Sequence, residues 1–181
     1  MLVEGVSDQL ALETLAARIG RDLAELEASV VPIGGASAIG ASLERFGPRG
    51  LDLRVAGLCD VGEEPLFRRG LERAGLGEDL DRAAMERLGF YVCVDDLEDE
   101  LIRFIGADAV ERLLESRGDL GPFRTLQMQP EWRGQPTEAQ LRRFMGSGGR
   151  RKIVYAPLLV EALDLLRVPR PLQAVLDHLA R

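Results

Sequence analysis

The chain has 181 residues, 46% of them hydrophobic and 29% charged, a composition typical of one soluble globular domain. No apolar run approaches the ~20 residues that a membrane-spanning helix needs, so a membrane protein is excluded. The formal net charge of −7 argues against nucleic-acid binding through overall positive charge, because phosphate would be repelled unless cations or a local basic face intervene.

Short apolar segments alternate with amphipathic ones through the first half of the chain. Strands are predicted over 1–6, 29–35, 51–60 and 89–96, and helices over 7–20 and 37–47. Alternating strands and helices predict an α/β fold with a four-stranded parallel sheet flanked by helices.

The second half of the chain is predicted to be helical. Apolar residues recur three and four positions apart over 97–106, 107–118, 136–146, 150–166 and 171–180. Pro157 predicts a kink in the long fourth segment, because an interior proline removes a backbone hydrogen bond. We expect one domain over 1–181, with the sheet core in 1–100 and a helical extension in 101–181.

Two further features bear on location and assembly. Cys59 and Cys93 end apolar runs without metal-ligand spacing, which predicts buried free thiols and a cytoplasmic protein. An apolar stripe over 158–166 predicts a homodimer, although a central buried helix explains the stripe equally well.

Acidic residues follow three of the four predicted strands. Glu4 follows the first, Asp60 the third, and the acids leading to Glu98 the fourth. Parallel strands end at one sheet edge, so these carboxylates are expected to meet there. Carboxylates packed together repel unless they hold a cation, and oxygen ligands favour Mg²⁺ or Mn²⁺ over zinc.

Each acid also has a structural explanation. Asp8 beside Ser7 is equally well placed to begin a helix, near the positive end of the helix dipole. Asp60 also suits a turn, and most acids of the run "DDLEDELI" are expected to face water. Glu4 has the weakest such alternative, because an acid between apolar residues at a strand end gains little from solvent.

The glycines after the second predicted strand suggest a phosphate contact. Gly35, Gly40 and Ser42 have the spacing of a nucleotide phosphate loop, but Ala41 stands where that motif requires lysine. The nucleotide-binding interpretation therefore fails. The backbone at Gly34 and Gly35 is still predicted to approach a phosphate group.

Lys152 is the only lysine of the chain. It follows Arg150 and Arg151, and with Arg142 and Arg143 it forms the one dense basic cluster of the sequence. One interpretation is a solvated helix start. The other is an ammonium group that stabilises phosphoryl charge near the carboxylates, with Arg150 and Arg151 holding the nucleic-acid backbone.

Five blocks of the sequence resemble the TOPRIM domain of the OLD (overcoming lysogenization defect) nucleases. In chain order they are "LVEGVSDQLAL", "VVPIGGASAIG", "GLCDVGEE", "DLEDELI" and "GSGGRRKIVYA". The resemblance implies a DNA phosphodiesterase site with two divalent ions. It implies metal ligation by Glu4, Asp8, Asp60 and Glu98, and catalytic roles for Glu4 and Lys152.

The sequence departs from this family in two respects. The third-strand motif of the wider TOPRIM group is Asp-x-Asp, whereas Asp60 is followed by Val61 and Gly62, so Glu63 or Glu64 would have to substitute. OLD nucleases carry an ATPase domain ahead of this one, and the phosphate-loop motif is not intact here. The chain is thus a stand-alone version, a cut-out domain, or the partner of a separate ABC-type ATPase chain.

Three functions are consistent with these residues. The first is a metal-dependent endonuclease acting on DNA. The second is a non-catalytic or partner-dependent module that binds nucleic acid, as the missing aspartate suggests. The third is a phosphohydrolase for small phosphate esters, which would use the same ligands in a smaller pocket.

Overall fold

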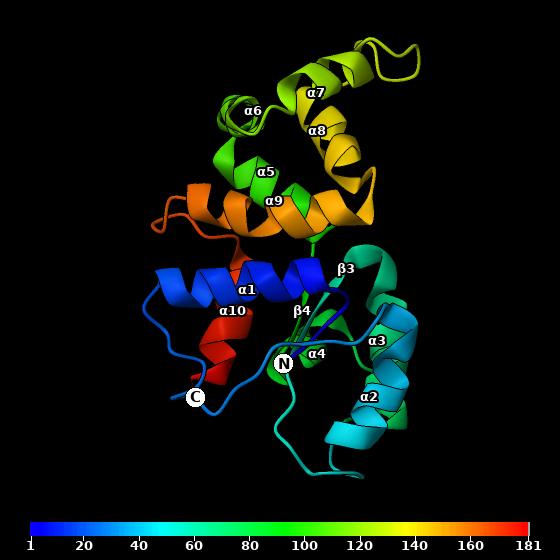
Figure 1. Cartoon of the computed structure of the whole chain (residues 1–181). Helices are drawn as coiled ribbons and strands as arrows, with labels where there is room; N and C mark the ends of the chain where they lie inside the picture. The colour runs from blue at the N-terminus through cyan, green and yellow to red at the C-terminus, as the bar shows by residue number, and fades with distance from the viewer. Residues whose placement is uncertain (181) are drawn as a thin grey trace.

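A computed structural model describes residues 1–180 as a four-stranded parallel sheet with helices around it (Figure 1). The strands, in the spatial order β2-β1-β3-β4, are β1 (Leu2–Val3), β2 (Val31–Pro32), β3 (Gly57–Asp60) and β4 (Phe90–Cys93). The predicted fold class is therefore confirmed, and each strand lies within its predicted segment.

Ten α-helices occur in the part of the chain that the structure describes. They are α1 (Val6–Arg18), α2 (Ile39–Phe46), α3 (Glu64–Arg73), α4 (Arg82–Arg87), α5 (Leu97–Ile105), α6 (Ala107–Ser116), α7 (Leu120–Gln127), α8 (Thr137–Gly146), α9 (Gly149–Ala162) and α10 (Arg170–Leu179). None of these helices has both the length and the apolar character needed to cross a bilayer.

Side chains of the central strands alternate between two hydrophobic cores, one on each face of the sheet. Leu58 packs into the larger core and Cys59 into the smaller one, and Cys93 of β4 returns to the larger. This follows from the two-residue period of a strand. Cys59 and Cys93 are buried free thiols, as predicted, and they lie on opposite faces of the sheet.

The helices that connect the strands lie on both faces. The chain passes from β1 to β2 through α1 on the face of the larger core, and from β3 to β4 through α3 and α4 on the other face. The connections therefore leave β1 and β3, which are neighbours in the sheet, in opposite directions. In open parallel sheets, such a switch point is where ligands bind, outside the carboxyl ends of the strands.

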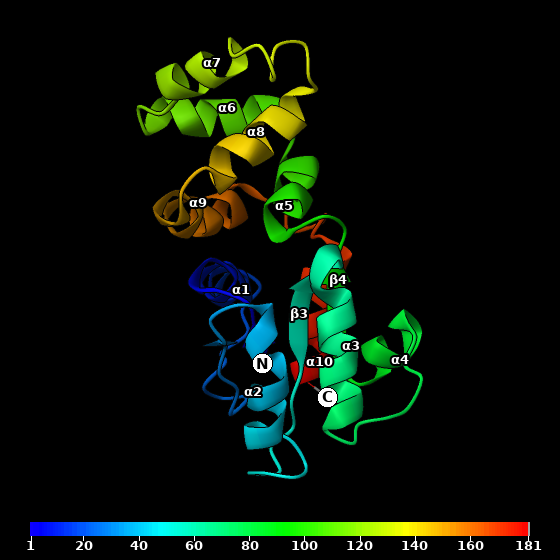
Figure 2. The ribbon, with the colours of Figure 1, turned by 90° about the vertical axis from the view of Figure 1, so that its right-hand side faces the viewer.

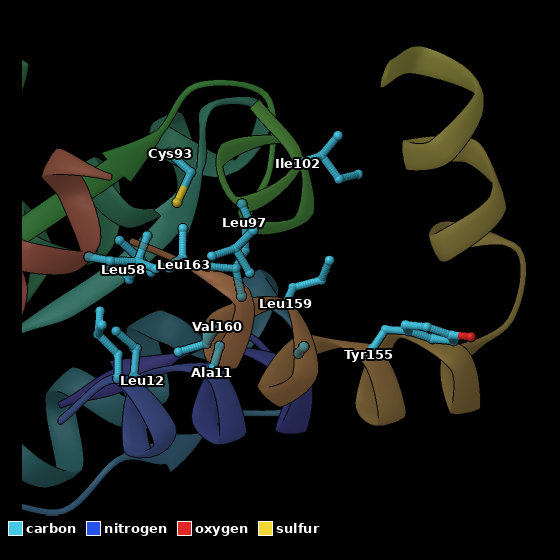
Figure 3. Packing of buried hydrophobic residues seen from close by; sticks show 14 of the residues in the cluster. Ala11, Leu12, Leu58, Cys93, Leu97, Ile102, Tyr155, Leu159, Val160 and Leu163 are labelled. Atoms are coloured by element: carbon cyan, nitrogen blue, oxygen red, sulfur yellow. The ribbon is translucent and has the colours of Figure 1, made fainter. Parts of the chain in front are cut away.

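A helical unit formed by α5 to α9 lies beyond that edge of the sheet, in the upper half of Figure 1. Figure 2 shows α9 beside α1, at the base of this unit. In Figure 3, Ala11 and Leu12 of α1 lie against Val160 of α9 in the larger core. The last helix, α10, returns to the sheet and packs against β3 and β4.

The structure differs from the predicted elements in a few places. The helices α3, α4 and α7 were not predicted. Helix α9 continues through Pro157 and ends at Ala162, four residues short of the predicted end. Leu159 and Leu163 of the apolar stripe are buried in the chain's own core, whereas Leu166 is 93% exposed. A homodimer stays a prediction.

Gly57, at the start of β3, is required because Phe90 of β4 lies against its Cα. A Cβ at position 57 would lie 2.6 Å from the Phe90 ring, which is fully buried. We expect Gly57→Ala to lower the free energy of unfolding by about 1–3 kcal/mol, the usual cost of overpacking a core. Urea unfolding measures this effect. Gly121→Ala in α7, where nothing lies within 4 Å of the added Cβ, is the control and should cause no loss.

Candidate metal centre

Glu4 and Asp8 lie at the turn from β1 into α1. The strand ends at Val3, and Gly5 is the N-cap of α1. The Asp8 carboxylate accepts a hydrogen bond of 2.8 Å from the Gly5 backbone N–H. Asp8 thus lies in the first turn of α1, as its structural explanation predicted, although the helix begins at Val6 and Gly5, not Ser7, is the N-cap. The Asp8 carboxylate is close enough to that of Glu4 for the Glu4 charge to raise its pKa.

Asp60 is the last residue of β3, next to β1 in the sheet. Its backbone N–H donates a hydrogen bond of 3.1 Å to Oε1 of Glu4. This bond connects the carboxyl ends of the two strands across the switch point. The acids that follow the first and third strands thus meet, as predicted.

Glu98 enters the same region from the first turn of α5. Its side chain is 3% exposed and forms an ion pair with Lys152 of α9, with 2.9 Å between Oε2 and Nζ. Its other oxygen, Oε1, is buried and has no hydrogen-bond partner in residues 1–180. A buried carboxylate oxygen without a donor is costly, and a bound cation would satisfy it.

A second ion pair connects the helical unit to this edge. Asp96, the N-cap of α5, accepts a 2.8 Å hydrogen bond from the Asp99 N–H with one oxygen. Its other oxygen accepts a 2.7 Å bond from Nε of Arg142 in α8. Asp96 and Arg142 therefore belong to the site, although the sequence interpretation assigned Asp96 to a solvated run of acids.

The electrostatics show that these carboxylates share one region. Burial, followed by the charges of neighbouring acids, raises the pKa of Asp60 to about 8. Those acids are Glu4, Asp8, Asp96 and Glu98. Burial also raises the pKa of Asp8 to about 6, with Glu98 and Glu4 as further contributors. The Glu4 pKa is raised chiefly by burial, despite the hydrogen bond from Asp60.

Lys152 faces the same carboxylates. Burial alone would lower its pKa, but the adjacent Glu98 carboxylate outweighs that effect, and Asp96 and Asp60 add to it, so the pKa is raised. Lys152 therefore stays an ammonium group at neutral pH. Among the described residues of the site, Lys152 and Arg142 are thus the cations that face acids from three separate segments of the chain.

The donor chemistry of this cluster fits a hard divalent ion. Carboxylate oxygens are the preferred ligands of Mg²⁺ and Mn²⁺, and the pKa of Asp60 is raised chiefly by burial and further by the neighbouring acids. Across residues 1–180, no three His, Cys, Asp or Glu side chains are already positioned to hold one ion. To hold one ion, the described carboxylates would therefore have to lie closer together than they do here.

The two acids that could replace the missing second aspartate interact with different partners. Glu63 is close enough to Glu4 to raise its pKa. Glu64, the first residue of α3, forms an ion pair with Arg82 instead. Glu63 is therefore the acid available to the cluster.

The residues predicted to contact phosphate are divided between two places. Gly34 and Gly35 have positive φ angles, and the Gly35 N–H donates to the Glu4 carbonyl at 2.9 Å, so this turn adjoins the acids. Arg150 and Arg151 line a separate pocket with Asp119 and Tyr155. The Arg151 guanidinium lies 3.9 Å from the Phe144 ring centroid. Phosphate binding at these positions stays a prediction.

The pKa shifts predict how stability depends on pH without metal. The ordinary aspartate pKa of 3.8 applies to the unfolded chain, whereas folding raises the pKa of Asp60 to about 8 and that of Asp8 to about 6. Between pH 4 and pH 8 the folded chain therefore binds more protons than the unfolded chain. Stability is then full below about pH 4 and falls as the pH rises towards 8. Urea unfolding in EDTA at pH 5 and pH 8 tests this. Asp60→Asn should flatten the dependence, and an unchanged slope would contradict the burial of this acid.

Comparisons with known proteins agree with this geometry. Residues 1–61 match the family model described as the overcoming lysogenization defect protein-like TOPRIM domain. No curated protein matches the chain significantly.

Two solved structures show the same fold over nearly the whole chain. The C-terminal region of the Burkholderia pseudomallei OLD protein is 19% identical and covers 98% of this chain and 94% of its own, with a TM-score of 0.75. The C-terminal region of the Xanthomonas campestris pv. campestris OLD protein is 23% identical and covers 98% and 92%, with a TM-score of 0.73. Residues 1–61 thus match the OLD-like TOPRIM family model, and the chain as a whole has the fold of the C-terminal region of OLD proteins.

Proposed function

We propose that this chain is a divalent-metal-dependent endonuclease that hydrolyses DNA phosphodiester bonds with two Mg²⁺ or Mn²⁺ ions. The observation that carries the proposal is the convergence of Glu4, Asp8, Asp60 and Glu98 at the switch point of the sheet. Acids from three separate segments repel each other there, and a bound cation would offset that repulsion.

The residues of the centre have distinct roles in this proposal. Glu4, Asp60 and Glu98 ligate the ions, and Asp8 ligates or orients them. When bound, two divalent ions lower the pKa of a water molecule and stabilise the leaving oxygen of a phosphodiester. Lys152 offsets the negative charge that develops on the phosphate, as a fixed ammonium group does at a transition state.

The alternative function is a non-catalytic or partner-dependent module that binds nucleic acid beside a separate ATPase chain. Gly62 stands where the TOPRIM motif has its second aspartate, and this favours the non-catalytic module, because the centre then depends on Glu63 for that carboxylate. The two functions differ in whether the isolated chain binds metal and cleaves.

Incubation of the purified chain with supercoiled plasmid and Mg²⁺ or Mn²⁺ tests the proposal. Conversion to open-circular or linear DNA with either ion, and none in EDTA, is the expected result. Calorimetric titration with Mn²⁺ runs in parallel. Absence of Mn²⁺ binding even at millimolar concentration, or Mn²⁺ binding without cleavage, would contradict the endonuclease and support the non-catalytic or partner-dependent module.

A further inference from the structure

A pocket of about 280 Å³ lies beside the metal centre, between α8 and the loop that precedes it. Its lining includes Asp96 and Arg142 of the ion pair described above, together with Trp132 and Arg143. Gly146, also part of the lining, adjoins the centre, because a Cβ placed there would lie 3.9 Å from Cε of Lys152. The pocket and the carboxylate cluster therefore share a wall.

Trp132 is held firmly in this wall. Its backbone carbonyl accepts a 2.7 Å hydrogen bond from Nε2 of Gln140, whose side chain is buried. Gln140 in turn accepts a 2.6 Å bond from Gln127 of α7. The indole packs against the larger core but stays partly exposed, and it contributes to the pocket lining. The hydrogen bond fixes the backbone at position 132, and the contact with the core limits the freedom of the indole.

The charge of the pocket differs from that of the chain as a whole. The Arg142 guanidinium is already paired with Asp96. Arg143 is exposed, and among the described residues it has no ion-pair partner. An aromatic side chain with an unpaired arginine is the combination with which proteins bind single-stranded nucleic acid, stacking on the base and attracting its phosphate.

We propose that this pocket binds one unpaired nucleotide of a DNA strand that lies in the metal centre, its base against Trp132 and a phosphate at Arg143. The inference rests on the proposed function and extends it to the substrate class: DNA with single-stranded, frayed or flapped segments. The volume suits one base, being below the roughly 300–1,000 Å³ of pockets that take a drug-sized ligand. A base within a duplex is stacked on its neighbours and would have to leave the stack first.

Tryptophan fluorescence tests this directly, because Trp132 is the only tryptophan of the chain. The full chain is titrated in EDTA with a short oligothymidylate and, separately, with a blunt duplex of equal length. We expect the single strand to quench the emission and to bind more tightly than the duplex. Absence of quenching, or equal quenching by the duplex, would overturn the inference.

Variants followed by anisotropy of a labelled oligothymidylate separate stacking from packing. Trp132→Phe keeps an aromatic face and should bind within about threefold of the unaltered chain. Trp132→Leu keeps apolar packing, and its affinity should fall by about 10-fold or more, within the range for losing one base-stacking contact. Equal affinity of the leucine variant, with an unchanged melting temperature, would refute the stacking role.

The role of Arg143 has a separate signature in the salt dependence. Arg143→Gln should reduce the slope of log affinity against log salt by about 0.7, the value for one contact with a single-strand phosphate. Arg87→Gln, an equal charge change on the exposed end of α4, is the matched control and should leave the slope unchanged. If both variants lower the slope equally, binding is non-specific and the site is not the one proposed.

These measurements need no metal, so they are independent of the cleavage test. Quenching without cleavage in Mg²⁺ or Mn²⁺ would contradict the endonuclease and leave the nucleotide pocket standing. Cleavage without quenching would support the endonuclease and contradict the nucleotide pocket.

Discussion

Replacing Asp60 with asparagine should reduce metal-dependent plasmid cleavage by at least about 100-fold. Asp60 lies at the end of β3, where its backbone already binds Glu4, so the asparagine side chain keeps the shape of the site while losing the charge. Loss of a residue that only supports a metal ligand typically costs about 10- to 100-fold in affinity or activity, and loss of a ligand should cost more. Gel assays of nicking, at saturating and limiting Mn²⁺, measure the effect.

The same variant should have the opposite effect on stability when metal is absent. The Asp60 pKa of about 8 shows that the charged form is disfavoured by burial and by the neighbouring acids, so a neutral amide relieves that cost. We expect a higher melting temperature in EDTA at pH 8. Glu64→Gln is the matched control, because Glu64 is an acid of the same segment that pairs with Arg82. If the Asp60→Asn variant cleaves plasmid as fast as the Glu64→Gln variant, the proposed centre is contradicted.

Replacing Lys152 with methionine should reduce cleavage by about 10²–10³-fold, the usual loss when one group that stabilises transition-state charge is removed. It should also destabilise the folded chain, because Glu98 is left buried without its counter-ion. Breaking a fully buried pair costs about 3–5 kcal/mol. The Lys152 side chain is 34% exposed, so we expect a smaller loss of about 1–3 kcal/mol.

A second substitution separates these two effects. Glu98→Gln added to Lys152→Met removes the unpaired charge and should recover most of the stability, as a double-mutant cycle by urea unfolding would show. Cleavage should not return. Recovery of cleavage in the double variant would contradict both a role of Lys152 in the chemistry and metal ligation by Glu98.

The sheet and its acidic edge could be predicted because their signals are local. Each strand is a short apolar run, and Glu4 and Asp60 directly follow such runs. The rule that parallel strands end at one edge then brings the acids together without any knowledge of the packing. The likeness to OLD TOPRIM domains rests on the same blocks.

The missed elements have weak local signals. The sequence of α3 contains Gly70, which allows close approach to Ile39 of α2, so a residue that weakens a helix is retained for packing. Helix α4 has only six residues, and α7 contains an interior proline at position 122. Periodicity is hard to see over such lengths.

The ion pair between Asp96 and Arg142 could not be predicted for a different reason. The two residues are 46 positions apart, and their contact depends on how α8 is placed over the start of α5. The signal available in the sequence was the Asp-Leu-Glu-Asp pattern that begins at Asp96, which is an N-cap signature as well as a run of charge. Arg142 was already noted in the basic cluster, but nothing linked it to this cap.

The packing of α9 along α1 has a consequence for how the centre is assembled during synthesis. Glu4 and Asp8 lie near α1, and Lys152 comes from α9, so the acids are translated long before their only ammonium partner. Until α9 docks, the nascent chain holds a cluster of uncompensated negative charge beside an uncovered apolar helix face. Docking of α9 on α1, seen in the Ala11–Val160 contact, therefore covers this helix face and supplies the ammonium group, and only the later-translated α10 adds the last residues of the larger core.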